Sequence, residues 1–100
     1  MLPTYASYCA TKAAVEQLTR ISAKEVGQRG ITVNVVSPGP TNTELFTEGK
    51  SEADIQRLAA MAALGRIGQP EDVANLVLFL ASDEAGWISA QNIGANGGLA

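Results

Sequence analysis

The chain has 100 residues, of which 46% are hydrophobic and 17% are charged, and its formal net charge is −3. This composition is typical of a single globular domain, and the acidic balance with scattered Lys and Arg argues against nucleic acid or an anionic membrane surface as partners. Because the chain has one cysteine, Cys9, and no histidine, a disulfide framework, a cysteine-based metal site and Ser-His-Asp catalysis are excluded.

No segment has the pattern of a membrane span or a secretory leader. The longest apolar run, residues 73–81, is too short to cross a bilayer and is interrupted by Asn75. Residues 1–4 lack the basic start and apolar core of a signal peptide. We therefore expect a cytoplasmic protein with no membrane partner.

Residues 6–28 have the periodicity of an amphipathic helix. The hydroxyl of Thr4 or Ser7 can cap its start, because a side-chain oxygen there accepts a hydrogen bond from an otherwise unpaired backbone N–H. Gly30 is placed to end the helix, because glycine adopts the left-handed conformation without a steric clash. The apolar stripe at helical spacing consists of Ala10, Ala14, Leu18 and Ile21.

Residues 31–36 are predicted to form a strand, because five of the six are β-branched. Pro38 and Pro40 stop it. The strand is apolar nearly throughout, which suits a parallel strand covered by helices on both faces. Residues 41–50 are expected to be a loop.

Two further helices are predicted in the second half of the chain. Ser51, with Asp54 three residues later, resembles a weak capping box and opens the first. Pro70 stands where a first-turn proline belongs and opens the second, over residues 71–82. This second helix is apolar most of the way round, which predicts burial in a large core or against a partner.

A last strand is predicted around Gln91–Ala95, and Trp87 is expected to anchor the preceding turn against the sheet. The order helix, strand, helix, helix, strand is typical of an α/β fold with a parallel sheet. Two short strands do not make a stable sheet by themselves. We therefore expect residues 1–100 to be part of a domain.

Three ordered segments resemble the short-chain dehydrogenase/reductase family. The first, Tyr8-Cys9-Ala10-Thr11-Lys12 followed by Ala13-Ala14, is similar to the family's Tyr-x-x-x-Lys helix. The second, ITVNVVSPGPTNTE, is similar to its sixth strand and Pro-Gly cofactor loop. The third, LGRIGQPEDVANLVLFLASDEAGWISAQNIGANGG, is similar to its last helix and last strand. A single Tyr-x-x-x-Lys is common by chance, whereas three ordered motifs are specific.

The resemblance implies an oxidoreductase that uses NAD or NADP on a doubly wound, Rossmann-type parallel sheet. Its substrate would be a small molecule with a carbonyl or secondary alcohol, as in 3-oxoacyl-thioester reductases or sugar and alcohol dehydrogenases. No segment here resembles the glycine-rich turn that receives the pyrophosphate in such folds, and the family's catalytic serine lies upstream of the tyrosine. We therefore expect residues 1–100 to be a partial Rossmann-type domain that lacks the N-terminal dinucleotide-binding half.

Tyr8 and Lys12 are the candidate catalytic residues. Hydride transfer to or from a carbonyl leaves an oxygen that must gain or lose a proton. A phenol, whose pKa is ordinarily about 10, can exchange that proton when a nearby ammonium favours its phenolate form. Four residues along a helix place Lys12 on the same face as Tyr8, and the resemblance adds that Lys12 binds the nicotinamide ribose. From spacing alone, an amphipathic pair on an exposed face is the other interpretation; the rival Tyr5 has no lysine at this offset.

The cofactor-binding residues that the resemblance implies are, besides Tyr8 and Lys12, Pro38, Gly39, Thr41 through its backbone and Thr43 through its side chain. Glycine allows a ligand to approach the backbone closely, and a threonine hydroxyl can bond a carboxamide. The other interpretation is a plain turn that ends the strand. The segment that follows matches the family's variable substrate-covering region, where four residues either line an apolar pocket or are only core: Leu45, Phe46, Met61 and Leu64.

The resemblance also implies a homo-oligomer, a tetramer or a dimer, for the full-length protein. A second hypothesis comes from a different functional class. The 100-residue chain would then be a catalytically inactive fragment that at most docks to full-length subunits, because no dinucleotide fingerprint precedes Tyr8.

Overall fold

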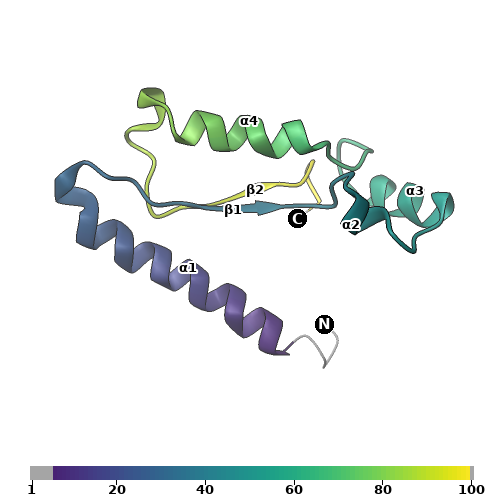
Figure 1. Cartoon of the computed structure of the whole chain (residues 1–100), viewed down its shortest axis with the longest axis horizontal. Coiled ribbons are helices and arrows are strands. Elements are labelled where there is room, and N and C mark those ends of the chain that lie inside the picture. Colours follow the sequence, from purple (N-terminus) through teal and green to yellow (C-terminus); the bar gives the residue numbers. More distant parts are fainter. Residues whose placement is uncertain (1–5, 100) are drawn as a thin grey trace. The chain divides into compact units, whose positions relative to one another are not determined.

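The computed structural model describes residues 6–99, and its helices and two strands are labelled in Figure 1. Thr4 and Tyr5 lie outside the described residues. The chain divides into two units, residues 1–35 with 86–93 and residues 36–85 with 94–100. In chain order the elements are α1 (Ala6–Val26), η2 (Gly27–Arg29), β1 (Val35–Pro38), α2 (Glu44–Thr47), α3 (Glu52–Met61), α4 (Pro70–Leu80), η3 (Asp83–Ala85) and β2 (Asn92–Ala95).

In the first unit, the 21-residue helix α1 continues into the short 3-10 helix η2. Gly30 ends it in the left-handed conformation, with φ 74°, and its N–H donates to the carbonyl oxygen of Gly27 at 2.9 Å. The predicted position of the helix end is therefore confirmed. The Asn92 side-chain amide donates to the Glu16 carboxylate at 2.6 Å, which ties α1 to the start of β2.

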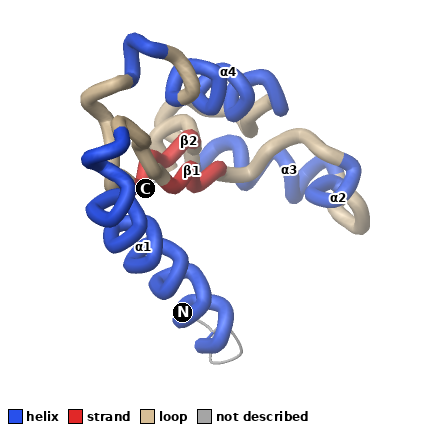
Figure 2. Tube along the Cα trace, turned by 60° about the vertical axis from the view of Figure 1, so that its left-hand side comes forward, coloured by secondary structure: helices blue, strands red, loops and turns tan. Residues whose placement is uncertain are grey.

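Strands β1 and β2 lie side by side and run parallel (Figure 2). The predicted strand over residues 31–36 is wrong in its bounds, because β1 begins at Val35 and extends to Pro38. Before Val35 the pairing mixes backbone and side-chain bonds, because the Ala90 N–H donates to the Val33 carbonyl oxygen at 2.8 Å and the Val33 N–H donates to Ser89 Oγ at 3.1 Å. The Asn34 amide donates to the Ile88 carbonyl oxygen and accepts from the Gln91 N–H, both at 3.1 Å. Sequence propensity detects β-branched residues but not this use of an asparagine.

The second unit contains α2, α3 and α4. Residues 41–50 were expected to be a loop, but they include α2, which begins where the Thr43 hydroxyl accepts a hydrogen bond from the Phe46 N–H at 3.3 Å. The capping box of α3 is complete, because Ser51 Oγ accepts from the Asp54 N–H at 3.1 Å and Asp54 accepts from the Ser51 N–H at 3.3 Å. Pro70 is the first residue of α4, as predicted.

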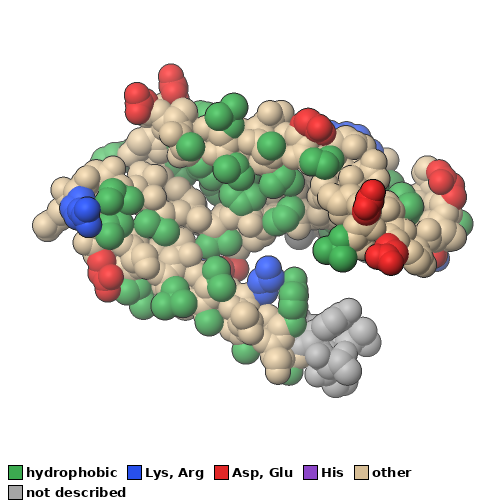
Figure 3. Space-filling model, in the orientation of Figure 1, with side chains coloured by type: hydrophobic (Ala, Val, Ile, Leu, Met, Phe, Trp, Pro, Cys, Tyr) green, Lys and Arg blue, Asp and Glu red, His purple; other side chains and the backbone are tan. Residues whose placement is uncertain are grey.

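Little apolar surface is buried among the described residues. The only buried hydrophobic side chains there are alanines, at positions 23, 59, 62 and 85. Hydrophobic side chains accordingly reach the surface at several places on the face drawn in Figure 3. Leu78 of α4 is 72% exposed. Within residues 6–99, α4 is therefore not buried as the sequence predicted. The expected anchoring by Trp87 is wrong, because its side chain is 99% exposed.

Residues 6–99 contain neither a membrane-spanning helix nor a cluster of metal ligands. None of the helices there is both long and apolar enough to cross a membrane. In the same part of the chain, no three Cys, Asp or Glu side chains gather as a metal ion would require.

Candidate active site

Helix α1 brings the two predicted catalytic side chains together. The Lys12 ammonium lies 5.4 Å from the centroid of the Tyr8 ring, in a cation–π arrangement. The Tyr8 side chain is 60% exposed, so a ligand can reach it, and the neighbouring Cys9 is half-buried. This geometry supplies a phenol with a positive charge beside it. The roles of Tyr8 and Lys12 stay predictions.

Gly39 lies where β1 passes into the predicted cofactor loop. Its N–H donates to the Ala95 carbonyl oxygen at 2.9 Å. A Cβ atom at this position would lie 2.7 Å from Asn96 Cβ and 2.9 Å from Asn96 Cα. The sequence suggested a glycine that lets a ligand approach. The structure gives another reason for it, the close approach of the backbone after β2.

Thr41 and Thr43 each retain a hydrogen-bond donor that a ligand could use. Thr41 Oγ1 donates to the Gly39 carbonyl oxygen at 2.8 Å, while within residues 6–99 the Thr41 backbone N–H has no protein acceptor. The Thr43 hydroxyl accepts from Phe46 to cap α2, which leaves its hydrogen for donation. The carboxamide of a nicotinamide carries an acceptor oxygen, so the two donors fit this group.

The loop is attached to residues 66–72, a connection that the sequence analysis missed. The Gly68 N–H donates to the Pro40 carbonyl oxygen, and the Asn42 N–H donates to the Gly68 carbonyl oxygen, both at 2.8 Å. These two bonds place Thr41 opposite Gly68 as an isolated parallel bridge. The conformation of the loop therefore depends on the segment around Gly68.

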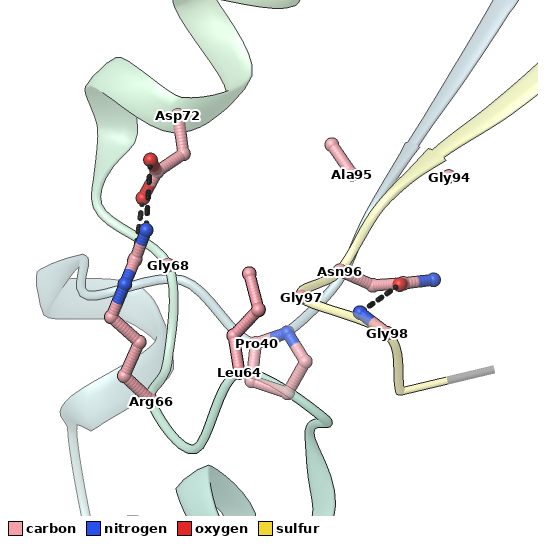
Figure 4. Close-up of a pocket in the computed structure, with 10 residues that line it drawn as sticks. All are labelled: Pro40, Leu64, Arg66, Gly68, Asp72, Gly94, Ala95, Asn96, Gly97 and Gly98. Atoms are coloured by element: carbon pink, nitrogen blue, oxygen red, sulfur yellow. Dashed lines mark hydrogen bonds and ion pairs between the residues drawn. The ribbon is translucent and has the colours of Figure 1, made fainter.

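An ion pair between Arg66 and Asp72 closes that segment (Figure 4). Arg66 Nη1 lies 2.8 Å from Asp72 Oδ2, and Nη2 lies 3.2 Å from Oδ1. The Arg66 guanidinium, together with the N–H of Gln69, lowers the pKa of the Asp72 carboxyl to about 2. The carboxylate is therefore ionised at neutral pH. The sequence carried one signal for this ion pair. Asp72 is the third residue of a helix that begins with Pro70, and Arg66 stands six positions before it.

A pocket of about 240 Å³ lies beside this ion pair in the second unit. Of the four apolar residues considered for a substrate pocket, only Leu64 lines it, and it is still 71% exposed. Leu45 is 87% exposed, Met61 is 61% exposed and Phe46 is half-buried, all three outside the lining. The lining, drawn in Figure 4, consists of Pro40, Leu64, Arg66, Gly68, Asp72, Gly94, Ala95, Asn96, Gly97 and Gly98. Among the predicted loop residues, Pro38, Gly39, Thr41 and Thr43 are outside this lining. They belong to the second unit, and Tyr8 and Lys12 to the first.

Comparison with known proteins gives matches along the whole chain. The model of the enoyl-(acyl carrier protein) reductase family matches residues 1–100. A short-chain type dehydrogenase/reductase of Picea abies is 50% identical over 97 residues. A 3-oxoacyl-(acyl carrier protein) reductase of Rickettsia felis is 46% identical over 100 residues, and an NADPH-dependent aldehyde reductase-like chloroplastic protein of Arabidopsis thaliana is 46% identical over 96.

A solved structure agrees with these matches. A double variant of a Serratia marcescens short-chain dehydrogenase/reductase superposes with a TM-score of 0.83 at 36% sequence identity, and the match covers 99% of this chain and 40% of that one. The three curated relatives are likewise longer: the matches cover 96 to 97% of this chain but 36 to 40% of theirs. The chain therefore spans about two-fifths of the length of the proteins that it resembles.

Proposed function

We propose, because the chain belongs to the short-chain dehydrogenase/reductase family, that the full-length protein interconverts a carbonyl and a secondary alcohol with NAD(H) or NADP(H). The observation that carries this proposal is the Lys12 ammonium 5.4 Å from the Tyr8 ring, at the family's Tyr-x-x-x-Lys position. The names of the relatives support a 3-oxoacyl thioester or an aldehyde as substrate.

Tyr8 acts on the proton that accompanies hydride transfer. In reduction its phenol gives a proton to the developing alkoxide oxygen, and in oxidation its phenolate takes the alcohol proton. Lys12 places a positive charge beside the ring. The nicotinamide, when bound, supplies or accepts the hydride. A correctly placed general acid or base contributes roughly 10²–10⁴ to the rate.

The loop from Pro38 to Thr43 holds the cofactor in this proposal. The Thr41 N–H and the Thr43 hydroxyl offer donors to the carboxamide. The rigid turn at Pro38 and Gly39 fixes their direction, because the Gly39 N–H is bonded to β2. Lys12 would bind the ribose hydroxyls in addition to its effect on Tyr8.

We also propose that residues 1–100 form the C-terminal part of a Rossmann-type domain whose dinucleotide-binding half lies outside them. The 36 to 40% coverage of the relatives supports this arrangement. So does the exposure of large apolar side chains on α4, since a helix of this composition is ordinarily covered. In the full-length protein these faces would pack against the rest of the domain and against further subunits of a dimer or tetramer.

The experiment is a reductase assay on the full-length gene product. NADH and NADPH are each supplied with an aldehyde, a ketone or a 3-oxoacyl thioester, and loss of the reduced nicotinamide is followed by absorbance. Oxidation of one cofactor with at least one carbonyl is expected, and the corresponding alcohols serve as controls that consume no reduced cofactor. A folded protein that oxidises neither cofactor with any carbonyl contradicts the proposal.

A second candidate function is an inactive chain that docks to full-length subunits. One observation favours it. Among residues 6–99, the buried hydrophobic residues are all alanines, and every larger hydrophobic side chain is at least partly exposed. A fluorescence titration of the 100-residue chain with NADH, combined with co-purification, tests this second candidate. No binding, with co-purification of full-length subunits, is expected for the docking function. Saturable binding contradicts it.

A further inference from the structure

Asp72, in the first turn of α4, accepts hydrogen bonds from Arg66 and from Gln69. Its carboxylate receives the two hydrogen bonds from Arg66, and its Oδ2 also accepts from the Gln69 N–H at 2.7 Å. Arg66 Nη1 further donates to the carbonyl oxygen of Ile67 at 3.1 Å. The seven residues 66–72 are therefore closed into a loop by side chains at both ends. Gly68 lies inside this closed loop.

Gly68 is the point at which the closed loop meets the proposed cofactor loop. It donates to the Pro40 carbonyl oxygen and accepts from the Asn42 N–H, both at 2.8 Å. A third contact, from the Asn42 side-chain amide to Gln69 Oε1 at 3.4 Å, supports the same register. The backbone around Thr41 is thus fixed by a neighbour whose own position depends on Arg66 and Asp72.

We propose that the Arg66–Asp72 ion pair is a positioning device for cofactor binding. By holding Gly68 in place, it aims the Thr41 N–H and the Thr43 hydroxyl at the nicotinamide carboxamide. Arg66 and Asp72 do not themselves contact the reacting atoms. The inference rests on the proposed function, since it assigns a task to residues that serve the same cofactor.

The geometry suits positioning better than it suits stabilisation. The two side chains are 54% and 42% exposed, and exposed ion pairs contribute little to stability. A two-point contact between a planar guanidinium and a carboxylate nevertheless restricts orientation, which a lysine cannot reproduce. The ion pair therefore matters for where Gly68 lies more than for whether the chain folds.

The test compares Arg66→Gln with Arg57→Gln in the full-length gene product. Arg57 forms an exposed ion pair with Asp54, with 2.7 Å between Nη2 and Oδ1, and none of its hydrogen bonds reaches the loop. We expect Arg66→Gln to raise the KM and the dissociation constant for the cofactor about threefold to tenfold, with kcat within about twofold of wild type. For Arg66→Lys, the cofactor dissociation constant should lie between those of wild type and Arg66→Gln. For Arg57→Gln, it should equal that of wild type.

Amide hydrogen exchange measures the stability of the two hydrogen bonds between Gly68 and the cofactor loop. Arg66→Gln should speed exchange at Asn42 and Gly68, whose N–H groups make the two connecting bonds, and leave Ala62, on the same unit, unchanged. Wild-type cofactor affinity in Arg66→Gln, or the same loss in Arg57→Gln, overturns this inference and leaves the proposed function intact. A wild-type protein that binds neither NADH nor NADPH overturns the proposed function, and this inference with it.

Discussion

Replacing Gly39 by alanine tests whether this glycine is required by packing. An added Cβ would lie 2.7 Å from Asn96 Cβ and 2.9 Å from Asn96 Cα, closer than Cβ atoms ordinarily come to any heavy atom. The nearer obstacles include a backbone atom, so no side-chain rotation relieves the clash. The backbone of Gly39 does not have a positive φ, so the cost comes from this contact alone.

The size of the effect follows from two contributions. Inserting an extra carbon into a packed site costs about 1–3 kcal/mol. A shift of the strands that relieves the contact weakens the hydrogen bond from the Gly39 N–H to the Ala95 carbonyl oxygen, which is worth about 0.5–1.5 kcal/mol. We therefore expect Gly39→Ala to lower the free energy of unfolding by about 1.5–4.5 kcal/mol, the sum of the two ranges.

Urea unfolding followed by circular dichroism measures this difference. Gly27→Ala is the matched control, because a Cβ at Gly27 meets no atom within 4 Å. At such a site alanine stabilises by about 0.4–1 kcal/mol through the unfolded chain. If Gly39→Ala unfolds at the same urea concentration as wild type and loses only cofactor affinity, the packing explanation is wrong, and the glycine serves the ligand.

Two further predictions concern the second unit. Ser51→Ala removes the hydroxyl that accepts from the Asp54 N–H and should lower the free energy of unfolding by about 0.5–2 kcal/mol, measured by urea unfolding; an unchanged midpoint contradicts the cap. Because Asp72 has a folded pKa of about 2, below its ordinary 3.8, its stabilising effect is complete above the higher value and is lost as the pH falls through the lower. Wild type should therefore lose stability between pH 3.8 and 2 more steeply than Asp72→Asn in acid titrations, and parallel curves would refute the assignment.

The ends of the helices could be predicted from the sequence because their signals are local. Gly30 ends the first helical segment, Pro70 begins α4, and Ser51 with Asp54 forms the capping box. Each depends on residues at most four positions apart. The family resemblance was equally accessible, because the order of three motifs is a property of the sequence alone.

The features that the sequence did not predict depend on distant residues. Before β1 begins, the Asn34 side chain bonds to Ile88 and Gln91, more than 50 positions away. Helix α2 is only four residues long, too short for periodicity to reveal it. Trp87 was expected to pack because of its size, whereas within residues 6–99 no neighbour covers it.

The candidate site was predicted only in part for the same reason. Tyr8 and Lys12 share a helix face, so their spacing predicts their proximity. The hydrogen bond from the Gly68 N–H to the Pro40 carbonyl oxygen joins residues 28 positions apart, so no local sequence pattern predicts it. The Arg66–Asp72 ion pair joins residues six positions apart, a spacing longer than the three or four residues that bring side chains together on one helix.

If Tyr8 transfers the proton, Tyr8→Phe removes the group that carries it. The substitution removes one hydroxyl and keeps the ring beside the Lys12 ammonium. The measurement is kcat together with the cofactor dissociation constant for the full-length gene product, wild type against variant. We expect kcat to fall by roughly 10²–10⁴ while the cofactor still binds with near wild-type affinity. Turnover retained within a few-fold of wild type would contradict it.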